Sequence, residues 1–398
     1  MHHPGYSHKP RQLLVDVSVL AVHDAGTGIQ RVVRSILAEL QGRDIADVDV
    51  RPIAADGRTS YRYLPIRPDA RWGAALDLAS LPEVQVGSED IFLGLDLATV
   101  SLRIHERQLA SWRASGARMH LVVYDLLPLR HPGWFRRRTR RNYRRWLGVI
   151  ERNAHEVICI SRYVASDFKR WLARPKLTAR RPIVVTSLSL GGNIEASSPS
   201  LGLPGDAAEV LAWMKARETV LMVGTVEPRK AYDRALPAFE RLWASAGAEA
   251  PQLAIVGRPG WKTARLQRRL RQLSGLQGPC LWLDDVSDEF LGLLYQASAG
   301  VLFATHAEGF GLPMVEALAK GKRVLARDHP ALRELAAPGV TFFGNDAPRE
   351  LGETVQQWLR DEAVSKIEPQ ASRSWSDATS DLLTLLGLAD QSATAPGA

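Results

Sequence analysis

The chain has 398 residues, of which 45% are apolar and 24% charged, a composition typical of a globular protein. This length is too great for one ordinary hydrophobic core, so we expect two domains. The cysteines, Cys159 and Cys280, lie far apart, which excludes a disulfide framework and favours a reducing, cytoplasmic compartment. No run of about 18 or more apolar residues occurs, and the first residues lack the apolar core of a secretory signal, so we expect no spanning helix.

The first half alternates short apolar runs with amphipathic stretches. A loop at 23–28 separates a strand at 13–17 from a helix whose apolar residues between 29 and 40 share one face. Further strands are expected at 91–95, 120–124 and 157–160. This alternation predicts a parallel sheet covered by helices on both faces. Residues 1–200 hold 30 Lys and Arg against 19 Asp and Glu, so the net charge of +8 resides here and indicates an anionic partner.

The second half restarts the alternation after a stretch rich in Ser, Gly and Pro, 186–207, which we interpret as a linker. Its expected strands are 219–223, 252–256, 281–283 and 300–303, and its helices lie around 231–246, 262–273 and 288–298. The domains are therefore expected at 1–205 and 206–375, followed by a C-terminal helix and loose tail at 376–398. Two Rossmann-like, doubly wound α/β domains would bind ligands beyond the carboxyl ends of their strands, in a cleft between the domains.

The segment 308–316, Glu-Gly-Phe-Gly-Leu-Pro-Met-Val-Glu, follows a strand and enters a helix, with Pro313 suited to the first turn. Its glycines would let the backbone approach a ligand, and the amides at the helix start suit a diphosphate. Glu308 precedes the turn and Glu316 lies about one helical turn inside it, so both carboxylates can face one ligand, where they suit sugar and ribose hydroxyls. A plain glycine-rich turn with a solvated Glu316 is the alternative.

A pair of cations, Arg229 and Lys230, follows the strand that ends at Gly224 and opens the next helix. Cations are unfavourable at a helix N-terminus, which is already positive, unless an anion shares the site. Arginine grips phosphate oxygens in a fork, and lysine acts as a point charge. With Gly224 and Thr225 in the preceding turn, the cations are interpreted as a phosphate-binding group, and an exposed basic turn is the alternative.

These segments carry a family resemblance. Together with residues 255–257 and 282–289 they resemble the donor-binding domain of GT-B glycosyltransferases of family four, whose signature is two glutamates with seven residues between them. Three segments of the first half are similar to the branch that acts in bacterial surface polysaccharide and O-antigen assembly, often as mannosyltransferases: 15–18, 26–32 and 124–132. The resemblance covers roughly residues 12–380 and is stronger in the second half.

The resemblance implies a retaining hexosyltransferase that uses a nucleotide-sugar and needs neither metal nor cofactor. GDP-mannose is the expected donor, and GDP-rhamnose or a UDP-sugar is the alternative. Glu316 would hold the ribose hydroxyls, and Glu308 would hold the transferred sugar near O3 or O4. Arg229 and Lys230 would neutralise the leaving diphosphate, since fixed cations can do so without Mg²⁺. The remaining donor contacts are implied for the main chain of Val286 at the base and for the amides of Phe310, Gly311 and Leu312.

Two positions in the first half are candidates for ligand contacts. Many relatives have a His-Asp pair where this chain has Tyr124-Asp125, so Asp125 becomes the candidate for orienting the acceptor. A turn residue that caps the next segment is the alternative. Gly28 opens the first long helix and could contact a phosphate or the acceptor, or it belongs to an ordinary strand-to-helix turn.

The segment 134–150 carries a run of arginines, with Tyr143, Trp146, Leu147 and Ile150 at helical spacing. A basic, Trp-bearing amphipathic helix can lie on an anionic bilayer. That placement suits a lipid-linked oligosaccharide acceptor and a peripheral location on the inner face of the cell membrane. In the alternative, the apolar stripe packs on the sheet of its own domain.

Other functional classes are less well supported. A polyanion- or nucleic-acid-binding protein that uses the arginines would show affinity falling steeply with salt, but it gives no reason for Glu308, Glu316, Arg229 and Lys230 to occur together. We therefore expect no nucleic-acid partner. A glycogen-synthase-like or phosphorylase-like enzyme of the same fold is the closer competitor.

Overall fold

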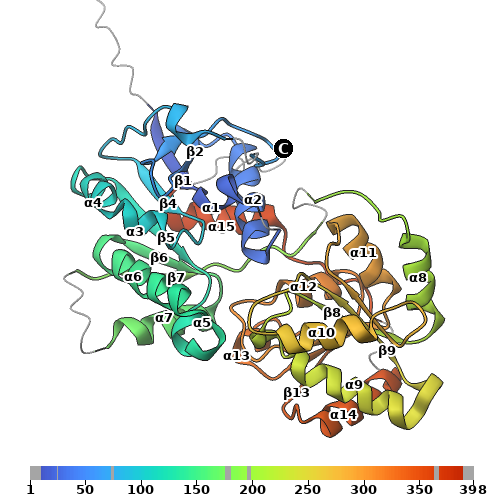
Figure 1. Ribbon diagram of the computed structural model, residues 1–398. Coiled ribbons are helices and arrows are strands. Elements are labelled where there is room, and N and C mark those ends of the chain that lie inside the picture. The colour runs from blue at the N-terminus through green and yellow to red at the C-terminus, as the bar shows by residue number, and fades with distance from the viewer. Residues whose placement is uncertain are drawn as a thin grey trace, which may run out of the picture. The chain divides into compact units, whose positions relative to one another are not determined.

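The computed structural model describes residues 10–24, 26–72, 76–174, 181–194, 199–362 and 367–388. They form two compact units, each built around its own sheet (Figure 1). The first unit takes the described residues within 1–129, 136–190 and 375–398, and the second takes those within 130–135 and 191–374.

The sheet of the first unit has seven strands in the order β3-β2-β1-β4-β5-β6-β7. All neighbours pair in parallel except β2 and β3. The strands are β1 (Arg11–Asp16), β2 (Val48–Ala54), β3 (Arg62–Tyr63), β4 (Ile91–Gly94), β5 (Arg118–Val123), β6 (Glu156–Cys159) and β7 (Val184–Ser187). The central strands β1, β4 and β5 are buried over nearly their whole length, as expected for a sheet covered on both faces.

The sheet of the second unit has six parallel strands in the order β10-β9-β8-β11-β12-β13. They are β8 (Thr219–Val223), β9 (Gln252–Val256), β10 (Cys280–Leu283), β11 (Gly300–Phe303), β12 (Val324–Arg327) and β13 (Val340–Phe343). The chain starts in the middle, winds to one edge, returns beside β8 and winds to the other edge, which is the doubly wound order of the Rossmann fold. The topological switch point therefore lies between β8 and β11.

The helices of the first unit follow its strands. They are α1 (Ser18–Val22), α2 (Gly28–Gln41), α3 (Ser101–Ile104), α4 (Glu106–Ala114), α5 (Leu127–Arg130), α6 (Arg137–Asn153), α7 (Arg162–Leu172) and α15 (Trp375–Leu386), with the 3-10 turn η1 (Leu78–Ser80). The 3-10 turn η2 (Pro132–Trp134) follows α5 along the chain but belongs to the second unit. The predicted apolar face of α2 is confirmed, because Val32, Val33, Ile36, Leu37 and Leu40 are all buried.

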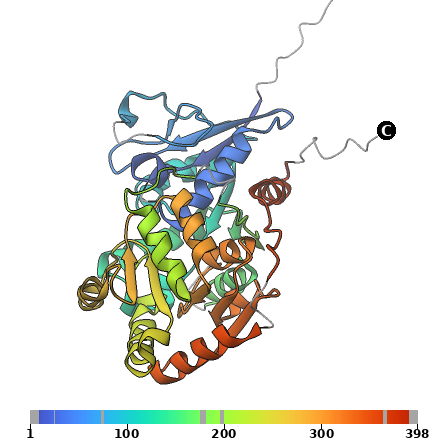
Figure 2. The same cartoon turned by 90° about the vertical axis from the view of Figure 1, so that its right-hand side faces the viewer.

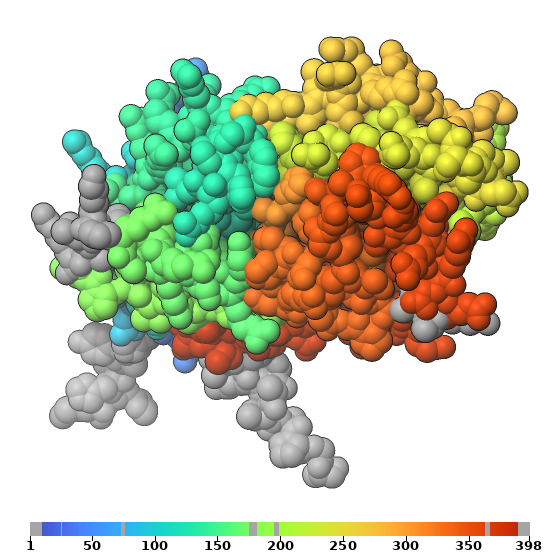
Figure 3. Space-filling view, turned by 90° about the horizontal axis from the view of Figure 1, so that it is seen from below, coloured from blue at the N-terminus to red at the C-terminus, as the bar shows by residue number. Residues whose placement is uncertain are grey.

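The helices of the second unit cover both faces of its sheet. They are α8 (Ala207–Ala216), α9 (Tyr232–Ala246), α10 (Ala264–Leu273), α11 (Asp288–Ala297), α12 (Leu312–Ala319), α13 (Pro330–Arg333) and α14 (Pro348–Arg360), with 3-10 turns η3 (Pro228–Lys230) and η4 (Gly247–Glu249). One core cluster joins the sheet to α9, α10 and α14, and another joins it to α8, α11 and α12. Alternate residues of β8 enter the two clusters, since successive side chains of a strand point to opposite faces. The packing of α14 beside α9 is visible at the surface in Figure 3.

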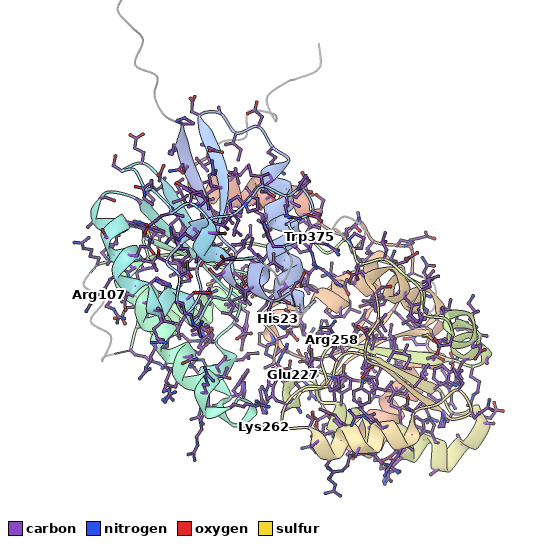
Figure 4. The ribbon with its side chains drawn as sticks, turned by 45° about the horizontal axis from the view of Figure 1, so that its top comes forward. His23, Arg107, Glu227, Arg258, Lys262 and Trp375 are labelled. Carbon is purple, nitrogen blue, oxygen red and sulfur yellow. The ribbon has the colours of Figure 1, made fainter. Side chains whose placement is uncertain are left out.

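The chain crosses between the units more often than a single linker would require. Residues 130–135 belong to the second unit although their neighbours on both sides belong to the first. After α14 the chain returns to the first unit, where α15 packs on α2 (Figures 1 and 2). Trp375, labelled in Figure 4, begins α15 and is fully buried, and Arg43 donates to Ser380 Oγ over 2.8 Å. Of the expected domains, 1–205, 206–375 and 376–398, the first includes residues 130–135, which belong to the second unit. The expected tail at 389–398 lies outside the described residues.

The stretch expected as a linker, 186–207, is structured at both ends. Its first two residues complete β7, and Ala207 begins α8. Between them, Ser200 N and Oγ donate to Asp288 Oδ2 over 2.9 and 3.0 Å, which fastens this part of the chain to the start of α11. Residues 195–198 lie outside the described residues.

The basic segment 134–150 is not one helix. Trp134 ends η2 in the second unit, whereas α6 begins at Arg137 in the first unit. The apolar side chains at helical spacing, Tyr143, Trp146, Leu147 and Ile150, are at most 3% exposed. They pack within their own unit, so the expectation that this stripe enters a bilayer is wrong.

Candidate functional site

The strongest group of candidate functional side chains lies in the second unit, where the neighbouring strands β8 and β11 end. Open parallel sheets bind ligands beyond the carboxyl ends of their strands at such a switch point. The loop after β8 carries Arg229 and Lys230, and the loop after β11 carries Glu308. Figure 4 labels Glu227 in the first of these loops, with Arg258 and Lys262 in the neighbouring loop after β9.

The sequence predicted that Arg229 and Lys230 open the long helix, and this prediction is wrong. They lie in the 3-10 turn η3, and Ala231, with φ of 57°, separates them from α9. Gly224 directly follows β8, its φ of +134° favours glycine, and a Cβ there would lie 3.1 Å from Cε of Lys230. Gly224 therefore gives Lys230 room to lie across the end of the strand.

Arg229, Lys230 and Glu308 form a compact ion-paired cluster. Arg229 Nη1 donates to both carboxylate oxygens of Glu308 over 2.7 Å, and Lys230 Nζ donates to Glu308 Oε2 over 2.8 Å. Burial alone would raise the pKa of Glu308, but the two cations outweigh it and lower the pKa to about 2. Burial lowers the pKa of Lys230, and Glu308 opposes that shift. The sequence predicted that both cations bind a phosphate. It gave no indication that Glu308 pairs with them.

Glu227 completes this cluster and was missed as a site residue. Its Oε1 lies 2.6 Å from Nε of Arg229, and the side chain is 5% exposed. The arginine is therefore held by a carboxylate at Nε and by another at Nη1. The main chain of Arg229 is fixed as well, because its carbonyl accepts from His306 N over 2.7 Å and from Thr305 Oγ1 over 3.0 Å. The signal in the sequence was a glutamate immediately before Pro-Arg-Lys.

The start of α12 follows Glu308 along the chain. Phe310 is 8% exposed, Gly311 is the N-cap with φ of +120°, and Leu312 is the first helical residue, followed by Pro313. A Cβ on Gly311 would lie 2.9 Å from Cδ2 of Leu332, so both the backbone angle and the packing require glycine. The predicted strand–turn–helix around Glu308 is confirmed, and the helix starts without a capping side chain.

Glu316 lies inside α12 and is buried, with 2% of its surface exposed. Tyr295 of α11 donates its hydroxyl to Glu316 Oε2 over 2.8 Å. The alternative of a glutamate solvated on a helix surface is therefore wrong. The structure gives the two glutamates of the motif different partners, a pair of cations for Glu308 and a phenol for Glu316.

Other predicted donor contacts lie around the same sheet edge. Thr225 follows Gly224 directly and is partly buried. Val286 lies in the loop between β10 and α11, partly buried against the core cluster that includes α11.

Residues 130–135, the crossing segment, bring aromatic side chains to this region. The ring of Trp134 stacks on His131 with centroids 4.0 Å apart and on His306 with centroids 6.1 Å apart. Trp261 donates its indole N–H to the carbonyl of Trp134 over 2.7 Å. Because His306 lies two residues before Glu308, the crossing segment packs next to the loop that carries the ion-paired cluster. The sequence offered no signal for this contact, since the partners are more than a hundred residues apart.

The remaining predicted residues, Asp125 and Gly28, lie in the first unit. Asp125 is partly buried, and its Oδ1 accepts from Leu127 N over 2.9 Å at the start of α5. Asp125 therefore caps the next segment, as the alternative interpretation expected. Its role in orienting the acceptor stays a prediction. Tyr124, at the position of the family's histidine, is buried and donates its hydroxyl to the carbonyl of Leu95 over 2.8 Å.

Gly28 is the first residue of α2, and a capping box formed by Thr27 and Gln30 closes this helix start. The geometry is that of an ordinary strand-to-helix turn, and a ligand contact at Gly28 stays a prediction.

A buried acidic group at the ends of β1 and β4 was also missed. Asp16 accepts from Ser18 Oγ over 2.5 Å and from Tyr61 Oη over 2.9 Å, and Asp96 accepts from the amides of Val19 and Leu20 over 2.9 and 2.7 Å. Burial raises the pKa of Asp16 to about 7 and that of Asp96 to about 6. These carboxylates cap α1 and tie β2 to β1, since Ser18 Oγ also accepts from Ala55 N.

No helix of the described residues is long and apolar enough to cross a membrane. Within the same ranges, no group of three or more His, Cys, Asp or Glu is arranged to hold a metal ion.

Two features now define the class of protein: a pair of Rossmann-like sheets in one chain, and fixed cations beside a helix start at the switch point of the second sheet. This is the GT-B architecture. Solved structures agree: Anabaena Alr3699/HepE, determined with UDP-glucose, matches with a TM-score of 0.60 at 16% identity, covering 94% of each chain. A sucrose-phosphate synthase from Thermosynechococcus elongatus matches with a TM-score of 0.64 at 15% identity, covering 95% of this chain and 98% of that one. At such identities the likeness shows the fold alone.

Sequence comparison adds a family match for the second half of the chain. Residues 206–376 match the family described as glycosyl transferases group 1. The chain is 38% identical over 361 residues to the serotype-specific mannosyltransferase WbdA of Escherichia coli. The alignment covers 89% of this chain but 43% of that protein, so the chain spans less than half the length of this relative.

Proposed function

We propose that this chain is a retaining hexosyltransferase that transfers mannose from GDP-mannose to a lipid-linked glycan in the synthesis of a bacterial O-antigen or related surface polysaccharide. The observation that carries the proposal is the cluster of Arg229, Lys230 and Glu308 at the switch point of the second sheet. Two fixed cations suit a ligand that combines a diphosphate with a sugar, because they pair with a carboxylate that lies a few residues before an uncapped helix start.

Each part of the donor has a candidate partner. Arg229 and Lys230 bind the diphosphate, and the amides around Gly311 bind its oxygens and the sugar. Stabilising the negative charge that develops on the leaving diphosphate is the main catalytic task, and fixed cations perform it without a metal ion. Glu308 takes the sugar hydroxyls, and Glu316 takes the ribose hydroxyls.

Other loops bind the base of the donor and the acceptor. Val286 contacts the base through its main chain, and Gly224 with Thr225 lines the phosphate end. In the first unit Asp125 orients the acceptor hydroxyl, and Gly28 contributes an amide at the start of α2. These assignments follow the family resemblance of the motifs that contain them.

The choice of mannose is supported by the mannosyltransferase relative, which is similar along most of this chain. GDP-rhamnose and UDP-sugars remain the alternative donors. The acceptor proposed is a glycan on a lipid carrier, reached at the inner face of the cell membrane. The exposed arginines of α6 support this location, because clustered cations are attracted to anionic lipids.

The test is a panel of nucleotide-sugars scored for thermal stabilisation and for transfer, with EDTA present. GDP-mannose is expected to raise the melting temperature of the native protein and to support transfer in EDTA. Glu316→Ala is expected to lose the stabilisation by GDP-mannose, because the ribose loses its partner. Glu353→Ala, an exposed glutamate on α14 paired with Arg349, is the matched control and should behave as native.

Each failure has a separate meaning. If no nucleotide-sugar stabilises the native protein beyond Glu316→Ala, the proposed enzyme activity is wrong. If a UDP-sugar or GDP-rhamnose stabilises it and GDP-mannose does not, the activity stands and the donor changes. If transfer occurs without EDTA and is lost when EDTA is present, the metal-independent mechanism is wrong.

A further inference from the structure

Arg229 is held by two carboxylates that engage different edges of its guanidinium. Glu227 binds Nε at 2.6 Å, on the side nearest the main chain. Glu308 binds the terminal Nη1 through both oxygens at 2.7 Å and also accepts from Lys230. The four side chains carry two positive and two negative charges, so the cluster is neutral and its cations are fully paired.

This pairing conflicts with a simple picture in which Arg229 and Lys230 wait for a diphosphate. An anion that arrives at these cations meets the partly buried carboxylate of Glu308 in the same place. Like charges in contact in a poorly solvated site repel strongly. The anion and Glu308 therefore compete for the cations, whereas Glu227 occupies a different edge of the guanidinium.

We infer that Glu308 is an exchangeable partner of the two cations: the diphosphate of the donor displaces its carboxylate, which is thereby released to bind the hydroxyls of the transferred sugar, while Glu227 stays in place and positions Arg229. The inference rests on the proposed function and adds an order of events within that site. It makes Glu227 a positioning residue, because it acts on the ligand through Arg229.

The exchange has a consequence for selectivity between substrate and product. Once released, the partly buried carboxylate of Glu308 needs new hydrogen-bond donors, since leaving it unsatisfied is costly. A nucleotide-sugar supplies those donors as sugar hydroxyls. A nucleoside diphosphate does not, so it displaces Glu308 without compensation. The site should therefore hold the sugar-bearing donor and release the nucleoside diphosphate after transfer.

The experiment uses inorganic pyrophosphate as the probe, because it engages the cations and carries neither sugar nor ribose. Its affinity is measured by calorimetry on the full chain. Glu308→Gln is expected to bind pyrophosphate about tenfold more tightly than native, because the competing charged hydrogen bonds are gone. Glu316→Gln, with the same chemical change in the same motif, should bind pyrophosphate as native does.

Simple repulsion makes a different prediction. If Glu308 acted only through its charge, Glu227→Gln would tighten pyrophosphate binding to a similar degree, since both carboxylates contact Arg229. Exchange predicts no gain for Glu227→Gln, because that carboxylate is not displaced and its loss frees the arginine side chain. Glu308→Asp, which keeps the charge but has a shorter arm, is the second variant if Glu308→Gln fails to fold. Exchange predicts a smaller gain for it, and repulsion alone predicts none.

The outcomes separate the inference from the proposed function. Glu308→Gln should also lose most of the native preference for GDP-mannose over GDP. If the native protein binds nucleotide-sugars while Glu308→Gln binds pyrophosphate no more tightly than native, the exchange is wrong and the function stands. If Glu227→Gln gains as much as Glu308→Gln, the exchange is also wrong. If the native protein binds neither pyrophosphate nor any nucleotide-sugar, the proposed function itself fails.

Discussion

Arg229→Ala should destabilise the second unit as well as impair catalysis, because it removes the partner of two carboxylates. Glu227 is 5% exposed and Glu308 14% exposed in their side chains. After the substitution, Glu308 retains Lys230 at 2.8 Å. Glu227 instead loses its 2.6 Å ion pair and is left as a buried charge.

The loss of stability on Arg229→Ala can be worked out from the contacts of Arg229 with Glu227 and Glu308 and of Lys230 with Glu308. Hydrogen bonds to charged groups contribute about 1.5–3 kcal/mol each, but Arg229 is 21% exposed and Lys230 still compensates Glu308. Removing one partner of a buried ion pair costs about 3–5 kcal/mol. We expect the low end, about 3 kcal/mol. For a unit of this size, that corresponds to a fall in melting temperature of roughly 6–12 °C.

The assay is urea unfolding and calorimetry of the native chain, Arg229→Ala and the double variant Arg229→Ala with Glu227→Gln. Neutralising the stranded carboxylate should recover at least about 1 kcal/mol, a coupling that a double-mutant cycle detects. The control is Arg234→Ala on α9, whose arginine is 49% exposed and should change stability by less than about 0.5 kcal/mol. A double variant no more stable than Arg229→Ala alone would refute the reasoning, since Glu227 would then carry no uncompensated charge.

Three further changes test other features of the two units. Gly311→Ala should cost about 1–3 kcal/mol of stability in calorimetry and reduce donor binding, because φ is +120° and the new Cβ meets Leu332 at 2.9 Å; a near-native melting temperature would contradict this. Tyr295→Phe should weaken nucleotide binding by less than Glu316→Ala does, since it removes one hydrogen bond and keeps the carboxylate. Asp16→Asn should flatten the pH dependence of the melting temperature. The native pKa of about 7 exceeds the ordinary 3.8, so the native state gains stability from Asp16 below about pH 4 and loses it as the pH rises through about 7. Equal slopes for native and variant between about pH 4 and 7 would overturn that prediction.

The central strands of both sheets could be predicted because burial on both faces leaves an uninterrupted apolar run, as in Leu13–Val15 and Leu253–Val256. The strands that were not predicted, β2, β3, β7, β12 and β13, lie at or next to the edges of the sheets, although β12 is as buried as a central strand. In β2 the run Val-Asp-Val-Arg-Pro mixes charge and proline into the first five residues, and β13 is a half-exposed edge strand of four residues. An edge strand has one neighbour and less burial, so its residues carry a weaker pattern.

The chemistry-bearing residues of the site could be predicted from local sequence, but their pairings could not. Glu308 and the cation pair are 78 and 79 residues apart, and Tyr295 is 21 residues from Glu316. No periodicity reports which side chain meets which across such separations. The sequence therefore identified the group as anion-binding, whereas the structure shows that the group already contains its own anions.

The basic helix α6 illustrates the same limit and ends in a prediction about the membrane. An apolar stripe at helical spacing has the same pattern whether it enters a bilayer or packs on a sheet, and here Tyr143, Trp146 and Ile150 pack inside the unit. The exposed arginines of α6 are Arg137, Arg138, Arg141, Arg144 and Arg145.

Each cation near an anionic surface contributes about 1 kcal/mol, and that contribution is screened by salt. Binding to vesicles with anionic lipids should therefore be reversible and fall steeply between about 0.05 and 0.5 M salt, and neutral vesicles should not bind. Glu substitutions at Arg141 and Arg145 should abolish it, whereas the same change at Arg349 on α14 should not. Binding that persists at high salt would require apolar insertion, and the packing of Trp146 would then have to be wrong.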